Sequence, residues 1–257
     1  MNRTEIHWMN GVDSLPEQMV FIGALPGVGN VGKIIVDALI EEHESECLAW
    51  LVHPDFPPHS TMKDGLLHPP RIEIHQVLLP MGLTVIVFTG DSQPLTPTGQ
   101  YELTDKILKM LDQADAELLL ILVGLQADVE EHSIHLVCSD ADTRDAFAER
   151  GVIASTTAPE AGMIGMAGLL AGMAPLRSVP AACAVAETLG STVDVITGQR
   201  LASWVEEKLG IALEISIDTT ESTAERIRRE IALDQTELDS LLNPSEPSPE
   251  FYVLSST

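Results

Sequence analysis

The stretch Phe21-Ile-Gly-Ala-Leu-Pro-Gly-Val-Gly-Asn-Val-Gly-Lys33 decides how the first part of the chain folds. The apolar run at residues 19–22 predicts a buried strand that leads directly into this glycine-rich turn. The apolar-rich segment that follows, residues 30–43, predicts a helix. A strand, a glycine turn and a helix in this order indicate the start of an α/β unit.

The glycines of this turn allow two interpretations. Gly27, Gly29 and Gly32 have the G-x-G-x-x-G spacing of a turn that binds a dinucleotide pyrophosphate at a helix N-terminus. The acidic residue required about 20 positions later is represented only by Asp55, which comes late, inside a proline-rich loop. Lys33 is followed by isoleucine, whereas a Walker-type loop needs Ser or Thr for Mg²⁺. The favoured interpretation is a tight turn with close helix-to-sheet packing and Lys33 at the surface.

The composition is strongly acidic. The chain has 257 residues, and its 14 Lys and Arg against 39 Asp and Glu give a formal net charge of -25. Because such a surface repels phosphate backbones, we expect no nucleic-acid partner. It suits docking on a basic surface of another protein. The length allows one large core, or one core with a small appendage.

The cysteines and the apolar runs indicate a cytoplasmic protein without a membrane partner. Cys47, Cys138 and Cys183 are far apart and form no CxxC pair, which is typical of reduced thiols in the cytosol. We expect no secretory signal before the first strand. The longest apolar region, residues 163–173, is too short and too rich in glycine to span a bilayer.

Apolar patterns predict further strands and helices along the chain. The run at residues 118–123 is uninterrupted, as in a central parallel strand that is buried on both faces. Residues 71–77 and 83–89 form a predicted hairpin. Other strands are predicted at residues 4–8, 47–52, 134–138 and 181–186, and helices from Tyr101 onward, at 140–150 and at 194–209.

The proline-rich loop at residues 54–59 is a second candidate for function. Its three prolines fix the backbone and remove hydrogen-bond donors, so neither a helix nor an inner strand can continue through it. Phe56 either packs on the chain's own core or belongs to a binding surface, and the sequence leaves both open. A possible small-molecule pocket combines this loop with the glycine turn, through Gly27, Gly29, Asn30, Lys33, Asp55 and Phe56.

Gly165, Gly168 and Gly172 mark another unusual stretch. They are three and four residues apart, so on a helix they share one face and allow another backbone to come very close. Glycine costs about 1 kcal/mol in a helix interior, so three of them indicate that this closeness is needed. The helix is either buried in the chain's own core or part of a subunit interface in a homo-oligomer.

The sequence pattern changes after residue 218. Residues 219–243 carry a narrow apolar stripe on an otherwise acidic predicted helix, which suits packing against one partner surface. Residues 244–249 have the composition of an extended or disordered linker. We therefore predict an α/β domain over residues 1–218, an acidic amphipathic helix over 219–243 and a flexible tail over 244–257. The tail's Phe251-Tyr252-Val253 either binds a partner or docks on the chain's own fold.

Histidines and hydroxyl groups do not form a recognisable catalytic motif. His132 and His135 are three apart near the start of a strand, so they point to opposite faces, and no H-E-x-x-H pattern occurs. Ser139, Ser155 and Thr156 are possible nucleophiles, but the sequence has no G-x-S-x-G elbow. We expect no catalytic residue, metal ligand or cofactor, although active-site residues can converge in space without a sequence motif.

Four blocks of this sequence, in order, resemble the archaeal branch of the proteasome assembly chaperone family. They are the glycine turn, the His-Pro-Asp-Phe-Pro-Pro loop at 53–58, Gly90-Asp-Ser-Gln-Pro94 with Gly99-Gln-Tyr-Glu-Leu103, and Gly165-Met-Ala-Gly-Leu-Leu-Ala-Gly172. The resemblance covers about residues 15–240. It implies a three-layer α/β/α sandwich with a mostly parallel central sheet, similar to nucleoside phosphorylases, assembly into a homo-oligomer and no established catalysis.

The resemblance also implies a partner. Family members that act as chaperones bind the proteasome α-subunit ring, some through a flexible C-terminal tail that ends in a hydrophobic residue, tyrosine and any residue. Phe251, Tyr252 and Val253 have this order, although Leu254-Ser-Ser-Thr257 follows them here. The expected function is a non-enzymatic, proteasome assembly chaperone-like protein that binds α subunits. The alternative is a small-molecule-binding protein, or a hydrolase- or phosphorylase-like enzyme, that uses the glycine-turn pocket.

Overall fold

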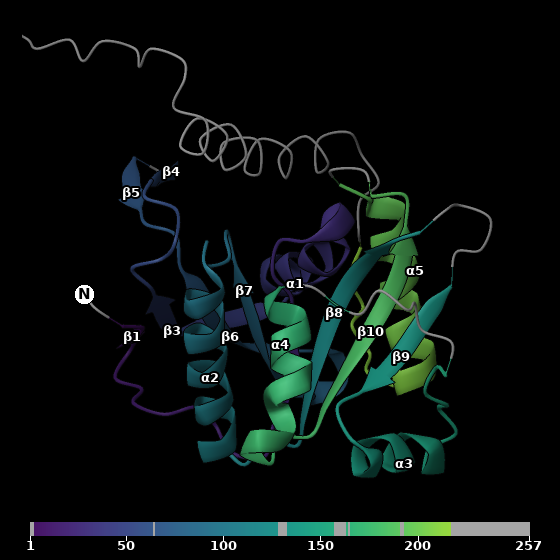
Figure 1. The fold of residues 1–257 in the computed structure, drawn as a ribbon. Coiled ribbons are helices and arrows are strands. Elements are labelled where there is room, and N and C mark those ends of the chain that lie inside the picture. Colours follow the sequence, from purple (N-terminus) through teal and green to yellow (C-terminus); the bar gives the residue numbers. More distant parts are fainter. Residues whose placement is uncertain are drawn as a thin grey trace, which may run out of the picture.

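The computed structural model describes residues 3–63, 65–127, 133–156, 163, 165–190 and 193–216. Within them, an eight-stranded sheet lies between two layers of helices (Figure 1). The helix predicted at 219–243 and the tail at 244–257, with Phe251, Tyr252 and Val253, lie outside the described residues.

The sheet is parallel in its centre and antiparallel at both sides, in the order β1-β3-β6-β7-β2-β8-β10-β9. The neighbours among β7, β2, β8 and β10 pair in parallel, and the other neighbours pair antiparallel. The strands are β1 Glu5–Trp8, β2 Val20–Gly23, β3 Glu44–Val52, β6 Ile72–Leu78, β7 Thr84–Gly90, β8 Leu118–Gln126, β9 Ile134–Cys138 and β10 Ala181–Thr188. The predicted fold class is confirmed, with the predicted β6–β7 hairpin on one side of the parallel centre.

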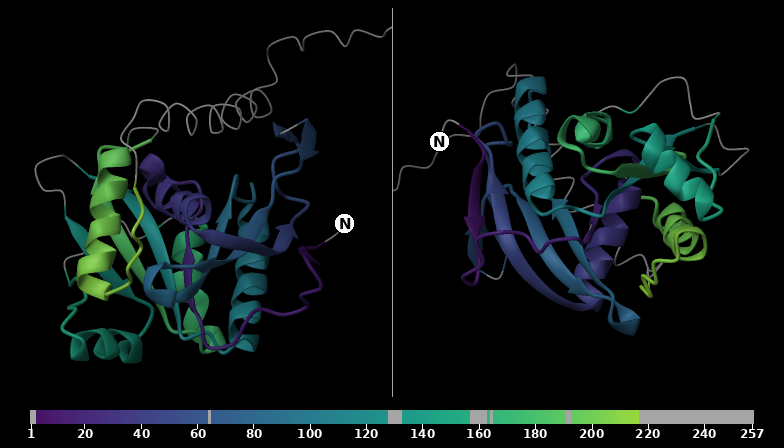
Figure 2. Two further views of the ribbon diagram at one scale, coloured as in Figure 1. Left: turned by 180° about the vertical axis from the view of Figure 1, so that it is seen from behind. Right: turned by 90° about the horizontal axis from the view of Figure 1, so that it is seen from below.

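Helices cover both faces of this sheet. Helices α1 (Val31–Glu42) and α5 (Val195–Trp204) lie on one face, and α2 (Pro97–Gln113) and α4 (Met166–Met173) lie on the other (Figures 1 and 2). Helix α3 (Ala141–Glu149) lies beside the edge strand β9. A separate hairpin, β4 (Thr61–Lys63) with β5 (Leu66–His68), projects from the body (Figure 2). None of the described helices has the length and apolarity needed to cross a bilayer.

The core consists of two large apolar clusters, one on each face of the sheet, and a small third cluster of Leu136, Phe147, Val152 and Ala182. Phe21 belongs to the cluster under α2 and α4, whereas its neighbour Ile22 belongs to the cluster under α1 and α5. In β8, Leu119 and Leu120 divide in the same way. Successive residues of a strand point to opposite faces, so a strand between two helix layers needs apolar residues at every position. This explains the uninterrupted apolar run predicted for the central strand.

The two helices predicted at residues 140–150 and 194–209 each begin at a capping aspartate. Asp140 Oδ1 accepts a hydrogen bond from Thr143 N at 2.8 Å at the start of α3. Asp194 Oδ1 accepts one from Thr197 N at 3.0 Å at the start of α5. Gly210, with φ of 70°, ends the short π-helical segment Val205–Leu209 that extends α5. The predicted start and end of this helix are therefore confirmed.

The glycine-rich helix α4 begins later than predicted. Gly165, with φ of 85°, caps the helix from outside, so the prediction that all three glycines share a helical face is wrong for Gly165. Gly168 packs within the chain, because a Cβ there would lie 2.4 Å from the carbonyl oxygen of Met163. Gly172 is exposed and would meet nothing within 4 Å. The chain's own packing therefore explains Gly168, and Gly172 is open to a partner.

Candidate functional site

The glycine turn joins β2 to α1 at the carboxyl ends of the parallel strands. Gly29 and Asn30 have φ of 63° and 48°, in the left-handed region. The Asn30 side-chain oxygen accepts a hydrogen bond from Gly27 N at 3.2 Å. The Gly29 carbonyl oxygen accepts one from Asp194 N at 2.8 Å, which fixes the turn to the start of α5.

Gly32 and Gly124 show why this turn needs glycine. A Cβ on Gly32 would lie 2.0 Å from the carbonyl oxygen of Leu122 in β8. A Cβ on Gly124, also in β8, would lie 2.1 Å from the carbonyl oxygen of Val28. The backbones of the turn and of β8 therefore approach each other at two points where no side chain fits. This geometry supports the interpretation of close helix-to-sheet packing.

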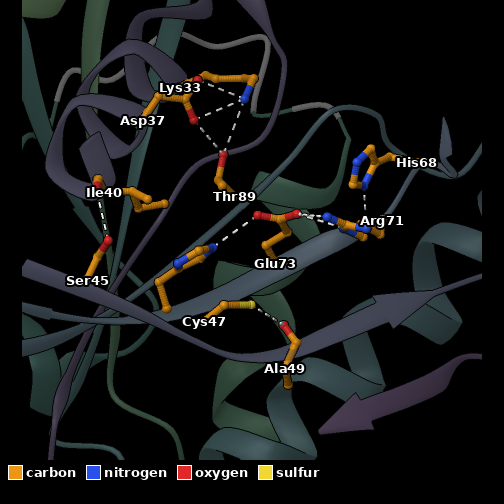
Figure 3. Close-up of polar contacts among 11 residues, drawn as sticks. Lys33, Asp37, Ile40, Ser45, Cys47, Ala49, His68, Arg71, Glu73 and Thr89 are labelled. Carbon is orange, nitrogen blue, oxygen red and sulfur yellow. Dashed lines mark hydrogen bonds and ion pairs between the residues drawn. The ribbon is translucent and has the colours of Figure 1, made fainter. Parts of the chain in front are cut away.

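Lys33 is buried, so the prediction of a surface position is wrong. Its ammonium lies 3.0 and 2.9 Å from the two carboxylate oxygens of Asp37 and 3.4 Å from Thr89 Oγ1 (Figure 3). Thr89 donates to Asp37 at 3.0 Å, and only 5% of Lys33 is exposed. Thr89 follows Lys33 by 56 residues, so no local pattern could reveal this contact. The lysine thus holds α1 against β7.

A second polar cluster lies on β6 beside this lysine (Figure 3). Glu73 accepts a hydrogen bond from Arg71 Nε at 2.7 Å, and His75 Nε2 lies 3.0 Å from its other oxygen. The guanidinium of Arg71 stacks 3.7 Å from the ring centroid of Trp50. Burial raises the pKa of the Glu73 carboxyl, but the hydrogen bonds from His75 and Arg71 outweigh it and hold that pKa at about 2.

The low pKa of Glu73 predicts a pH-dependent contribution to stability. Its usual value is 4.5, so the ionised side chain stabilises the fold fully above about pH 5 and loses this effect as the pH falls towards about 2. We expect Glu73→Gln to cost about 2 kcal/mol at pH 7. Urea denaturation should show the difference between the two proteins shrinking from pH 5 to pH 2. A difference that stays constant over this range would contradict the assignment.

The proline loop serves the chain's own packing. Asp55 Oδ2 accepts hydrogen bonds from the backbone N and the hydroxyl of Thr96, both at 2.7 Å, at the start of α2. Phe56 is 6% exposed and belongs to the apolar cluster under α2 and α4, the first of the two possibilities that the sequence left open. The predicted pocket residues Lys33 and Asp55 are thus paired with other side chains of the chain. The small-molecule pocket stays a prediction.

Gln93, just after the carboxyl end of β7, connects the four sequence blocks that resemble the chaperone family. Its side-chain nitrogen donates to the Pro26 carbonyl in the glycine turn at 2.7 Å. Its side-chain oxygen accepts from Met166 N at the start of α4, at 3.0 Å. Two residues on, Leu95 N donates to the Asp55 carbonyl at 2.9 Å. Sequence analysis did not single out Gln93, and its position inside the third block was the only available signal.

The structure brings together two residues that the sequence presented separately. His135 Nδ1 lies 3.0 Å from Ser155 Oγ, and His135 Nε2 lies 3.0 Å from Glu187 Oε1. Glu187 was not identified from the sequence, because it follows His135 by 52 residues and reaches it through the β9–β10 pairing. His132 lies outside the described residues. Among the residues that are described, no three His, Cys, Asp or Glu side chains are placed to hold a metal ion.

The protein is an α/β/α sandwich in which the glycine turn lets the backbones of α1 and β8 pack closely. The four sequence blocks that resemble the chaperone family lie next to one another around Gln93. The chain belongs to the PAC2 family, whose family model matches residues 21–233. This confirms the resemblance to proteasome assembly chaperones that the four blocks indicated.

Several relatives support this assignment. The structure of PbaB from Pyrococcus furiosus, an archaeal proteasome activator, is 25% identical, with a TM-score of 0.73 over 92% of this chain and 100% of that one. PbaA from the same organism, an archaeal homolog of proteasome-assembly chaperone, is 19% identical, with a TM-score of 0.71 over 93% and 100%. An uncharacterized protein of Methanocaldococcus jannaschii is 29% identical over 181 residues, 69% of each chain.

Proposed function

We propose that this protein is a proteasome assembly chaperone-like protein that binds proteasome α subunits in the cytoplasm. The carrying observation is its 25% identity to PbaB along 92% of the chain, with a shared fold. Two of its structural relatives are named for an action on the proteasome or for proteasome assembly. The proposed action is binding alone and involves no chemical step.

The proposed anchors are Phe251, Tyr252 and Val253. The last described residue is Ser216, whose backbone N donates a hydrogen bond to Glu42 Oε2 at 2.8 Å. Glu42 is the last residue of α1, so the part of the chain after residue 216 starts beside the end of that helix. Residues 217–250 are 34 positions, which span at most about 120 Å when fully extended. This length lets the anchors reach a pocket on a partner that does not touch the α/β body. Aromatic residues are the side chains that most often dominate binding at protein interfaces.

The charge of the chain supports a protein partner with a basic surface. With 39 acidic against 14 basic residues, the electrostatic field of the protein accelerates its encounter with a positively charged surface.

We further propose a homo-oligomer. Of the three glycines predicted for its interface, Gly172 is the one that faces open space.

The tail's role is tested by a double substitution. We expect Phe251→Ala with Tyr252→Ala to lower the affinity for purified α subunits of the same organism by at least about 30-fold, since hot-spot residues contribute about 2 kcal/mol or more. Biolayer interferometry measures this change. The matched control replaces Ser255 and Ser256 by alanine and should bind as the unmodified chain does.

A shortened chain tests whether binding depends on the tail or on the α/β body. A chain that ends at Asn243 keeps every described residue and lacks the proposed anchors. It should keep its thermal stability and lose binding as the double variant does. Equal affinity of the full and shortened chains would overturn the proposed role of the tail.

A further inference from the structure

Ser155, His135 and Glu187 form a hydrogen-bonded row across the edge of the sheet. His135 lies on the edge strand β9, and Glu187 lies on its neighbour β10. Ser155 lies on the other side of β9, where no described strand pairs with it, and its backbone N donates to the Leu136 carbonyl at 2.8 Å. The two side-chain distances in the row are both 3.0 Å. A hydroxyl within hydrogen-bond reach of a base, with that base held by a third group, is the arrangement of an activated nucleophile.

We propose that these residues form an acyl-transfer site that hydrolyses esters of short apolar acids. Ser155 is the nucleophile, His135 is the general base and Glu187 positions the imidazole. The site goes beyond the proposed chaperone function and uses none of the tail anchors Phe251, Tyr252 and Val253, whereas Gly172 of the proposed oligomer interface also lines the groove of this site. The imidazole presents Nδ1 to the serine and Nε2 to the carboxylate, and either ring nitrogen can accept a proton.

Glu187 is held as an anion in this row. The hydrogen bond from His135 lowers the pKa of its carboxyl, outweighs the opposing effect of burial and is supported by the Ser133 backbone amide. That amide donates to Glu187 Oε2 at 3.0 Å, so both carboxylate oxygens are fixed. The side chains of His135 and Glu187 are 13% and 18% exposed. A fixed, ionised and largely buried carboxylate selects one imidazole orientation and stabilises the imidazolium that forms during proton transfer.

An apolar groove meets this row at His135 and supplies the substrate class. Its volume is about 280 Å³, and His135 forms part of its wall. This is slightly smaller than the usual range for drug-sized ligands, about 300–1,000 Å³, so it suits a short acyl group. The groove runs between the sheet and α4, and its other wall residues include Leu125, Val137, Met163, Ala171 and Val185.

The reaction balances with water as its only co-reactant. Ser155 Oγ attacks the ester carbonyl carbon, and its proton passes to His135 Nδ1. The C–O bond to the alcohol breaks, and the alcohol leaves with that proton. Water then attacks the acyl-serine, again through His135, and releases the carboxylic acid and the free hydroxyl.

The first test needs no variant. The full chain is incubated with a fluorophosphonate probe, which modifies activated serines, and the modified residue is identified by peptide mass spectrometry. We expect modification at Ser155, with protection by p-nitrophenyl butyrate. Absence of modification, or modification at other serines only, would overturn the proposal.

Variants then separate the roles of the three residues. Hydrolysis of p-nitrophenyl butyrate should fall at least about 100-fold in Ser155→Ala and in His135→Gln, because a positioned base contributes about 10²–10⁴-fold. Glu187→Gln should lower kcat and leave KM unchanged, with partial recovery in Glu187→Asp. The control, Ser203→Ala, changes an exposed serine of α5 on the opposite face and should retain full activity. Hydrolysis that persists in Ser155→Ala contradicts the site, whereas α-subunit binding by this variant tests the chaperone function separately.

Discussion

Gly32→Ala is expected to destabilise the fold by more than about 4 kcal/mol, or to prevent folding. The added methyl group would lie 2.0 Å from the Leu122 carbonyl oxygen, 2.6 Å from its carbon and 2.8 Å from Ala24 Cβ. These atoms belong to β8 and to the residue after β2, in the parallel centre of the sheet, so they cannot move aside as a flexible side chain would. Urea denaturation and the soluble yield measure the effect.

Gly198→Ala is the matched control for this substitution. Gly198 lies in α5, which packs against α1, and a Cβ there would have ordinary contacts of 3.5 Å with Ile34 and with the Val31 carbonyl. We expect it to be neutral or to stabilise by up to about 1 kcal/mol, since alanine favours helix over glycine. Equal effects at the two positions would contradict the conclusion that the glycine turn is needed for backbone packing.

Lys33→Met is expected to destabilise the protein by about 3 kcal/mol. The substitution keeps the length of the side chain but leaves the Asp37 carboxylate, which is 17% exposed, without its cation. Loss of one partner from a buried pair costs more than the pair itself contributes, because the remaining charge stays desolvated. Denaturation at neutral pH measures this cost. A cost below about 0.5 kcal/mol would contradict the structural role assigned to Lys33.

The chain contains a matched exposed pair. Lys109 and Asp105 in α2 are also four residues apart, with side chains 48% and 31% exposed and an N–O distance of 2.6 Å. Lys109→Met should cost at most about 0.5 kcal/mol, since exposed pairs gain little from water. Asp105 also binds Arg177 and so keeps a cation in this variant. The two lysines therefore contrast a buried carboxylate that loses its cation with a more exposed one that keeps a second cation.

The sequence predicted elements well where the signal is local. Alternating or continuous apolar runs located the strands of the eight-stranded sheet, and the ranges predicted at 140–150 and 194–209 contain α3 and α5 with its π-helical extension. The uninterrupted run that became β8 also predicted its central parallel position. In each case, the residues that determine the element lie within a few positions of one another.

The sequence failed where distant segments meet. Lys33 was placed at the surface because its contact with Thr89 depends on how α1 crosses β7. Gln93 and Glu187 carried no local pattern, and their partners come from other elements. Gly165 was placed inside a helix, but it has a positive φ and lies before the helix as its cap. Sites built by the tertiary fold are therefore visible only in the structure.

The binding of α subunits is the central claim, and one measurement tests it most directly. The unmodified full chain is mixed with purified proteasome α subunits of the same organism, and the mass of each species is determined by size-exclusion chromatography with light scattering. The account predicts a new species that contains both proteins and whose mass matches their complex. If the two proteins elute separately with unchanged masses across a range of concentrations, the chaperone function is contradicted.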